Sequence, residues 1–236
     1  MPDSTQPVDS STLSEKLNDW SRIHAALLVL GTALCATMGT PSPLLVLGWV
    51  SFIRLLWVAR GRFRSSPGFG PANALTLLRL VMVFGLGSAL GPLTLSQCAL
   101  LGGAILLLDG ADGWVARKTR SASRFGAHFD METDAFFVLM TSLALWASGR
   151  LGVWILCGGL FRPLYVLWLW ALPAPHGEEP RSSFGRLAFL GFACGLLVPL
   201  ASSEPWADAA AALGTLAVTF SFGRSFNYWY RARAKK

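Results

Sequence analysis

Five acidic residues lie within one 26-residue window, in or against hydrophobic runs: Asp109, Asp112, Asp130, Glu132 and Asp134. An aspartate near the centre of a membrane-spanning helix costs about 2.5–3.5 kcal/mol, so intramembrane acids usually face a polar cavity and have a function. Clustered carboxylates also repel one another unless a positive charge lies between them. Magnesium prefers oxygen ligands and is typically held by a few carboxylates and substrate phosphates, whereas zinc prefers His and Cys at spacings that are absent here. The cluster therefore predicts a divalent-cation site for a phosphate-bearing substrate.

Two consecutive helices are expected to carry these carboxylates. On the first, predicted over residues 95–117, the residues that share one face at 100° per residue are Asp109, Asp112, Gly113 and Ala116. On the second, predicted over residues 126–148, an i, i+4, i+8 line holds Gly126, Asp130 and Asp134. The link of about eight residues between the helices makes them antiparallel neighbours. We therefore expect the four aspartates to converge near one membrane surface.

The chain as a whole has the composition of a membrane protein. Of its 236 residues, 53% are hydrophobic and only 14% are charged, a balance that is rare in soluble domains of this size. Runs of roughly 17–25 apolar residues, each long enough to cross a hydrocarbon core about 30 Å thick, recur along the chain. The runs predict an all-α integral membrane protein of about eight helices, at residues 23–39, 43–59, 73–91, 95–117, 126–148, 151–173, 184–202 and 206–229.

Three segments are expected along the chain. Residues 1–22 are polar and mixed in charge, without the basic start of a signal peptide, and predict a loose cytosolic leader. Residues 23–66 are expected to form an accessory transmembrane hairpin and a basic linker, and residues 67–236 a catalytic domain with a six-helix transmembrane core. The Trp residues mostly lie near the ends of the hydrophobic runs and predict aromatic belts at the membrane interfaces, for example Trp20, Trp57, Trp170, Trp206 and Trp229.

The basic residues indicate how the chain crosses the membrane, because short loops rich in Lys and Arg stay on the cytoplasmic side. If the helices alternate, only Arg150 falls in a loop on the far side, and the cytosolic side holds Arg60, Arg62, Arg64, Lys118, Arg120, Arg124, Arg181, Arg231, Arg233, Lys235 and Lys236. Both termini and the acidic site are then cytosolic. The net charge of +7 is dispersed at the ends of hydrophobic runs, which favours anionic lipid headgroups and argues against nucleic acid as a partner.

The acidic window also matches a known signature. Residues 109–117 read Asp-Gly-Ala-Asp-Gly-Trp-Val-Ala-Arg, followed by eight residues to Gly126, three to Asp130 and three to Asp134. All eight fixed positions match D-x2-D-G-x2-A-R-x8-G-x3-D-x3-D, so the chain resembles the CDP-alcohol phosphotransferase family. The stretch from Pro71 to Arg79 is similar to the segment that opens the first core helix in many members. The resemblance covers about residues 67–229, six helices in all, and leaves the leader and the hairpin outside it.

The resemblance implies roles for individual residues. Asp109, Asp112 and Asp130 would bind one or two divalent ions, Mg²⁺ or Mn²⁺, that also hold the diphosphate of the donor. Asp134 would be the general base and a further contact to the metal. Contacts to the cytidine and phosphates of the donor would come from Asn73, Thr76, Gly113, Ala116, Arg117 and Gly126. The ions would neutralise the diphosphate as CMP leaves, and a carboxylate would take the proton of the attacking hydroxyl.

The resemblance further implies a membrane enzyme that transfers a substituted phosphate from a CDP-alcohol to a small alcohol and releases CMP. We interpret the transferred group as phosphatidyl and the donor as a lipid such as CDP-diacylglycerol, because a lipid donor best explains a cytosol-facing site among membrane helices. This interpretation favours a step of phospholipid biosynthesis. Relatives with the same signature use different acceptors, phosphorylated or not, so the signature does not select the alcohol. Relatives are commonly homodimers, and we expect a homodimer here.

Three arginines lie within or at the start of hydrophobic runs, where an unpaired cation is unfavourable: Arg79, Arg162 and Arg186. Gly185-Arg186 resembles the glycine and basic residue with which many relatives bind a phosphorylated acceptor, so Arg162 and Arg186 are candidate acceptor contacts. A second basic residue often follows two positions on in the family, and Ala188 stands there in this chain. The alternative interpretation for all three arginines is pairing with a core carboxylate or reaching for the headgroups.

The remaining ionisable residues near the site are expected to have other roles. Glu132 and His128 lie off the face that Asp130 and Asp134 share, and Glu132 is expected to pair with a nearby basic side chain. His24 lies near the start of its hydrophobic run, where a solvated or interfacial role is expected.

Two other functions are compatible with acidic membrane helices. A magnesium-dependent aromatic prenyltransferase also holds a diphosphate with aspartate-rich helices, but its two motifs lie far apart in sequence, whereas both lie within 26 residues here. A cation transporter with a carboxylate site would be favoured by broken helices or a repeated architecture, and neither is visible in the sequence.

Overall fold

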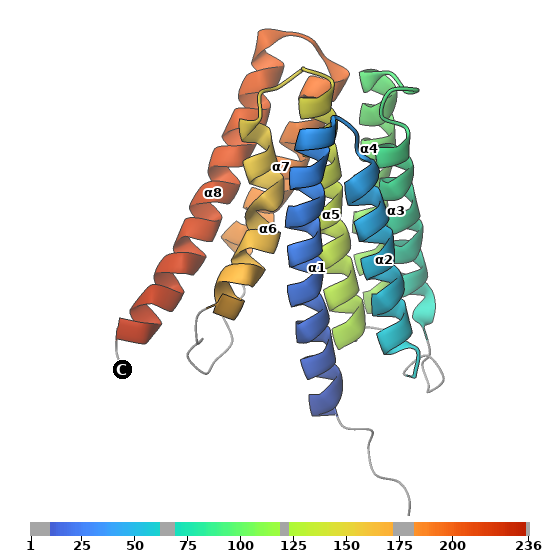
Figure 1. Ribbon diagram of the computed structural model, residues 1–236, viewed down its shortest axis with the longest axis vertical. Coiled ribbons are helices and arrows are strands. Elements are labelled where there is room, and N and C mark those ends of the chain that lie inside the picture. Colours follow the sequence, from blue (N-terminus) through green and yellow to red (C-terminus); the bar gives the residue numbers. More distant parts are fainter. Residues whose placement is uncertain (1–9, 62–68, 119–122, 172–181, 235–236) are drawn as a thin grey trace, which may run out of the picture.

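The computed structural model describes residues 10–61, 69–118, 123–171 and 182–234. These residues form a bundle of eight α-helices that alternate in direction (Figure 1): α1 Ser10–Met38, α2 Ser42–Ala59, α3 Gly70–Ser88, α4 Leu95–Lys118, α5 Arg124–Ala147, α6 Trp154–Ala171, α7 Ser183–Ala201 and α8 Pro205–Ala234. No β-strand occurs in this part of the chain. The predicted all-α fold with eight helices is confirmed.

Five of the described helices are long and apolar enough to cross a membrane: α1, α2, α3, α6 and α7. In α4 the apolar part is shorter, Leu95–Ala111. Helix α5 carries Asp130, Glu132 and Asp134, and nearly all of its residues from Glu132 to Leu145 are buried inside the bundle. The chain is therefore a multi-pass integral membrane protein in which α5 is an inner helix.

Helix α1 begins well before the predicted hydrophobic run. It starts at Ser10, so the loose leader predicted over residues 1–22 is wrong from residue 10 onward. Leu17 and Trp20 are each only 1% exposed, because apolar residues recur there at helical spacing despite the charges between them. Trp20 also donates its indole N–H to the carbonyl oxygen of Ser51 at 2.8 Å. Trp20 and Trp229 are both buried in the protein, and the aromatic belt predicted for them is wrong, whereas Trp57, Trp170 and Trp206 are exposed.

Helix α3 packs against both helices that carry the signature aspartates, α4 and α5. Helices α4 and α5 are antiparallel, as predicted (Figure 1), but among the described residues they pack mainly against α3 and not against one another, so the prediction that they are direct neighbours is wrong. Their other main partners differ, because α4 packs against α7 and α5 packs against α6. Helix α1 packs against α2 and α6 and also reaches α5, so the N-terminal hairpin contacts the inner part of the bundle.

Helices α7 and α8 approach each other closely at a glycine. Gly195 is buried on α7, and a Cβ atom at this position would lie 2.7 Å from the carbonyl oxygen of Ala210 on α8. Small residues of this kind let the backbones of membrane helices come into contact. A Cβ atom on Gly191, one turn earlier on α7, would meet nothing within 4 Å.

Replacing Gly195 with Ala should destabilise the protein by about 1–3 kcal/mol, because the added methyl group overlaps the α8 backbone. Gly191→Ala is the matched control, since it makes the same change in helix propensity on the same helix without a close contact. Thermal unfolding in detergent should show a lower midpoint for Gly195→Ala than for Gly191→Ala. Equal midpoints would contradict the close approach of α7 and α8.

Candidate active site

Helix α3 carries three buried polar residues along one face. Pro71 lies in the first turn, where a helix tolerates proline. The residues that follow at three-residue intervals are Asn73, Thr76 and Arg79, and only 7%, 3% and 1% of their surfaces are exposed, respectively. The Thr76 hydroxyl donates to the carbonyl oxygen of Ala72 at 3.2 Å. This face of α3 therefore brings polar groups into the interior between α4 and α5.

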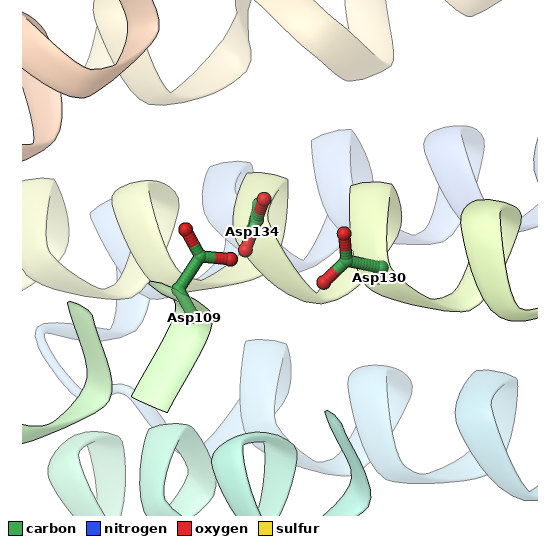
Figure 2. Close-up of side chains that lie close together, drawn as sticks. All are labelled: Asp109, Asp130 and Asp134. Atoms are coloured by element: carbon green, nitrogen blue, oxygen red, sulfur yellow. The ribbon is translucent and has the colours of Figure 1, made fainter. Parts of the chain in front are cut away.

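Three of the four predicted aspartates meet beside this face. Asp109 of α4 and Asp130 and Asp134 of α5 each place a carboxylate oxygen within 4.8 Å of the others (Figure 2). We call these three residues the aspartate triad. Their side chains are 34%, 40% and 21% exposed, respectively, so the triad is accessible from outside the bundle. The predicted convergence of carboxylates is confirmed for these three residues.

The fourth predicted ligand, Asp112, lies on the last turns of α4 together with the predicted donor contacts Gly113, Ala116 and Arg117. The helix continues to Lys118, but the side chains of residues 112–117 lie outside those that the structure describes. Their predicted roles therefore stay predictions. Helical periodicity alone still places Asp112 on the same face as Asp109.

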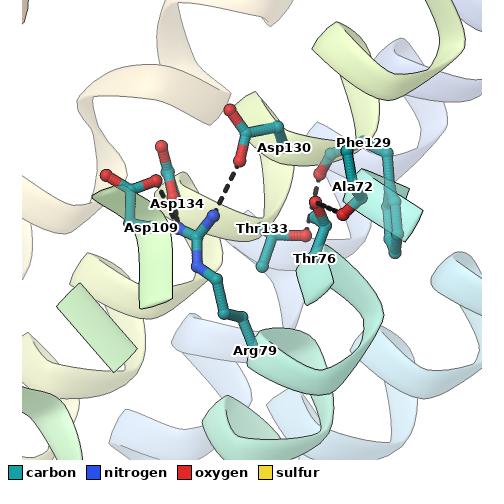
Figure 3. Close-up of polar contacts among 8 residues, drawn as sticks. All are labelled: Ala72, Thr76, Arg79, Asp109, Phe129, Asp130, Thr133 and Asp134. Carbon is teal, nitrogen blue, oxygen red and sulfur yellow. Dashed lines mark hydrogen bonds and ion pairs between the residues drawn. The ribbon is translucent and has the colours of Figure 1, made fainter. Parts of the chain in front are cut away.

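The guanidinium of Arg79 lies between the carboxylates of the triad (Figure 3). Its Nη2 is 2.8 Å from Asp109 and also contacts Asp134, and its Nη1 is 2.7 Å from an oxygen of Asp130. A guanidinium presents several N–H donors in a fixed plane, so one arginine can hold three carboxylates at once. Pairing with a core carboxylate, the alternative considered for Arg79, is confirmed.

The sequence predicted a carboxylate partner as one alternative for Arg79 but not that Arg79 contacts the predicted metal ligands. A signal for it was present, because Arg79 follows Asn73 and Thr76 at helical spacing on one face of α3. An arginine inside an apolar helix also requires acidic partners. The acidic window at residues 109–134 is the densest source of such partners in the sequence.

One guanidinium does not balance three carboxylates. The triad gathers three carboxylates around one guanidinium among apolar helices, and bound cations would stabilise such a concentration of acidic groups. The ligand atoms that the triad offers are all carboxylate oxygens, the type that Mg²⁺ and Mn²⁺ prefer. The residues therefore fit a hard divalent cation.

The first turn of α5 lies against Asn73 of α3. The hydroxyl of Ser123 caps α5 by accepting the backbone N–H of Gly126 at 3.0 Å. A Cβ atom on Gly126 would lie 2.7 Å from Oδ1 of Asn73, and the amide group of Asn73 donates to the carbonyl oxygen of Phe69. Two predicted donor contacts, Asn73 and Gly126, are thus neighbours, and Asp130 follows Gly126 one helical turn later.

The two predicted acceptor contacts have different surroundings. Arg162 of α6 places its Nη2 2.8 Å from Oε1 of Glu132, so the expected basic partner of Glu132 is confirmed and the charge of Arg162 is matched inside the protein. Arg186 is exposed on the first turn of α7, at the end of the bundle where α5 also begins (Figure 1). His24 is only 1% exposed, and the solvated or interfacial role predicted for it is wrong.

The family model described as CDP-alcohol phosphatidyltransferase matches residues 70–223, well over half of the chain. The chain belongs to the CDP-alcohol phosphatidyltransferase family. It is therefore a phosphotransferase of the kind that takes a substituted phosphate from a CDP-alcohol. The matched region runs from the start of α3 into α8, so it includes the aspartate triad and leaves α1 and α2 outside. Comparisons with curated proteins and with solved structures find no match.

Replacing Arg79 with Gln should tighten the binding of Mg²⁺, because the change removes a positive charge that opposes the ion. At an effective dielectric constant of about 20, two unit charges about 4 Å apart interact by about 4 kcal/mol. A tenfold change in the dissociation constant of Mg²⁺ needs only about 1.4 kcal/mol, which is about a third of that repulsion. In the absence of Mg²⁺ the same variant should unfold at a lower temperature, because the triad loses its counter-charge.

The Mg²⁺ dependence of thermal unfolding measures both effects on one sample. Arg150→Gln is the control, because it breaks an ion pair with Asp208, 2.7 Å apart. Arg150 follows the end of α5 and Asp208 lies in the first turn of α8, and these helix ends lie at the opposite end of the bundle from the start of α5 (Figure 1). The control should lower stability without changing the affinity for Mg²⁺. An unchanged Mg²⁺ affinity in Arg79→Gln would contradict the position of Arg79 at the cation site.

Proposed function

We propose that this enzyme transfers a phosphatidyl group from CDP-diacylglycerol, or a similar CDP-linked lipid, to the hydroxyl of a small alcohol and releases CMP. The observation that carries the proposal is the position of the aspartate triad within a bundle of apolar helices. A lipid donor can reach such a site from the bilayer while its acyl chains remain among the lipids. The reaction would be a step of phospholipid biosynthesis.

In this proposal the triad and Asp112 hold one or two divalent ions, Mg²⁺ or Mn²⁺, as is typical of the family. The ions would supply the positive charge that neutralises the donor diphosphate and the departing CMP. The contribution of Arg79 is to keep the carboxylates together. The donor would be held by Asn73, Thr76, Gly113, Ala116, Arg117 and Gly126.

Asp134 is the proposed general base. It lies one turn beyond Asp130 on α5, about 6 Å further along the helix axis. Its side chain is 21% exposed, against 40% for Asp130. A hydroxyl that attacks phosphorus has to lose its proton, and a carboxylate placed to accept that proton contributes about 10²- to 10⁴-fold to the rate. The deeper position supports Asp134 as the carboxylate that meets the acceptor.

Arg186 is the proposed contact for the acceptor. It is exposed, whereas Arg162 already has Glu132 as its partner. Ala188 is buried and supplies no second cation on the same turn of α7. Arg186 is therefore the basic contact that the described part of α7 supports for the acceptor.

We further propose that the site faces the cytosol and that the enzyme acts as a homodimer, the common state of relatives. Helix α1 begins and α8 ends at the same end of the bundle, where α5 also begins (Figure 1). Asp130 lies in the second turn of α5, so the triad is near that end. Lys118 and Arg124 lie at this end of α4 and α5, and loops rich in basic residues stay in the cytosol.

Release of CMP tests the proposal. The purified protein would be mixed with CDP-diacylglycerol, Mg²⁺ and one alcohol at a time, such as glycerol 3-phosphate, inositol phosphate, serine or choline. We expect CMP only when an acceptor and a divalent ion are both present, and turnover in excess chelator would contradict the metal requirement. Diphosphate release from a prenyl diphosphate would favour a prenyltransferase instead, and cation flux without CMP release would favour a transporter.

Asp134→Asn should lower kcat by about 10²-fold or more and leave donor affinity within a few-fold of the wild type, because an amide keeps the shape but takes no proton. Asp130→Asn is the comparison, since loss of a metal ligand should weaken Mn²⁺ and donor binding together. Steady-state kinetics and Mn²⁺ titration measure both variants. If Asp134→Asn loses Mn²⁺ affinity as strongly as Asp130→Asn, Asp134 is chiefly a metal ligand and the base lies elsewhere.

A further inference from the structure

A second charged group lies inside the bundle, apart from the triad. Glu132 of α5 is 3% exposed, and its Oε1 is 2.8 Å from Nη2 of Arg162 on α6. The same oxygen accepts the hydroxyl of Ser21 on α1 at 3.5 Å. Helix α1 lies outside the region that matches the family. This group therefore joins the N-terminal hairpin, α1 and α2, to two helices of the matched region.

The contact continues into the hairpin. His24 of α1 shares a hydrogen bond between its Nδ1 and Oγ of Ser51 on α2 at 2.8 Å, and it stacks on Trp20 with ring centroids 4.6 Å apart. His24 also meets Phe52 of α2 in an edge contact at 4.8 Å. Phe52 packs in turn against Phe136 of α5 at 5.6 Å between ring centroids. The hairpin thus holds α5 through both a polar contact and aromatic packing.

Glu132 lies midway between two triad residues in sequence but on the opposite face of α5. At 100° per residue it is about 160° around the helix from both Asp130 and Asp134. Arg79 of α3 holds the two aspartates on one face, and Arg162 of α6 holds Glu132 on the other. Helix α5 is therefore bound by a cation on each side.

A rotation of α5 about its own axis would move the triad directly. Side-chain atoms lie about 5–6 Å from the axis of a helix, so a rotation of about 10° moves a carboxylate oxygen by about 1 Å. A misplacement of that size can lower a rate by about 10²-fold. A buried ion pair is weak evidence for stability, and selecting one arrangement among several is its better attested use.

We propose that Glu132 and Arg162 are positioning residues of the active site, and that the N-terminal hairpin supports them through Ser21. Together they set the rotation of α5 and hence the positions of Asp130 and Asp134 in the triad. The inference rests on the proposed function, because it assigns this support to the same metal and base site.

Mn²⁺ affinity and kcat of full-length variants test the inference, measured well below the unfolding temperature of each variant. Glu132→Gln keeps the shape and removes the charge, so it should weaken Mn²⁺ binding about fivefold or more and lower kcat about tenfold or more. Arg162→Gln should do the same. Arg162→Lys keeps a cation beside Glu132 and should stay within about twofold of the wild type. Ser21→Ala should show the same losses as Glu132→Gln but weaker, about twofold.

Gly195→Ala is the control for a loss of stability alone, because its close contact lies between α7 and α8. It should lower the unfolding temperature without changing Mn²⁺ affinity. A purely structural role for the ion pair predicts the same behaviour for Glu132→Gln, so unchanged Mn²⁺ affinity and kcat in that variant would overturn the inference. If Glu132→Gln does not fold, Ser21→Ala decides, and wild-type Mn²⁺ affinity in Ser21→Ala would likewise overturn it.

The Mn²⁺ measurement needs no CDP-alcohol, which separates this inference from the proposed function. A wild-type protein that binds Mn²⁺ but releases no CMP would contradict the proposed function and leave the comparison of variants valid. A wild-type protein that releases CMP, with variants that bind Mn²⁺ equally well, would contradict the positioning role alone.

Discussion

Charge inside an apolar bundle has to be matched by opposite charge, and the inner helices are arranged around this constraint. Helix α5 carries Asp130, Glu132 and Asp134 within little more than one turn. The matching cations come from other helices, Arg79 from α3 and Arg162 from α6. Matching the charges of α5 therefore requires that α3 and α6 pack against it in a register that brings Arg79 and Arg162 to its acidic residues.

The two charged groups on α5 differ in their balance. Glu132 and Arg162 form a pair of one anion and one cation, and the Glu132 side chain is only 4% exposed. At the triad, Arg79 faces three carboxylates whose side chains are 21–40% exposed. The first group is complete within the protein. The second gathers several carboxylates in a position that ligands can reach, which is the arrangement that a site for cations and phosphates requires.

The N-terminal hairpin is more closely integrated than its place outside the family match suggests. Through Ser21 it reaches the oxygen of Glu132 that Arg162 also contacts, and through Phe52 it packs on Phe136 of α5. The division into an accessory hairpin over residues 23–66 and a catalytic domain over residues 67–236 stays a proposal. The contacts show that α1 and α2 belong to the same packed bundle as the site.

The sequence by itself determined the membrane location, the number of helices and the faces that carry the aspartates. Length and composition are enough to predict a spanning helix, and the regular turn of a helix is enough to place Asp130 and Asp134 on one face and Glu132 on the other. The described part of the structure contains eight helices, and Asp109 lies close to Asp130 and Asp134 of α5, as these patterns predict. The early start of α1 was missed because hydropathy is low where charges separate the buried residues Leu17 and Trp20.

Only the tertiary structure decided which charges meet. Sequence periodicity gives the face of a helix on which a residue lies, but not the helix that this face will contact. For both Arg79 and Arg162 the sequence allowed pairing with a core carboxylate or contact with the lipid headgroups, without naming a partner. In the structure Arg79 pairs with the triad and Arg162 pairs with Glu132. Their partners depend on the packing of α3 and α6 against α5, and that packing comes from contacts between residues far apart in the chain, such as Gly126 with Asn73 and Phe52 with Phe136.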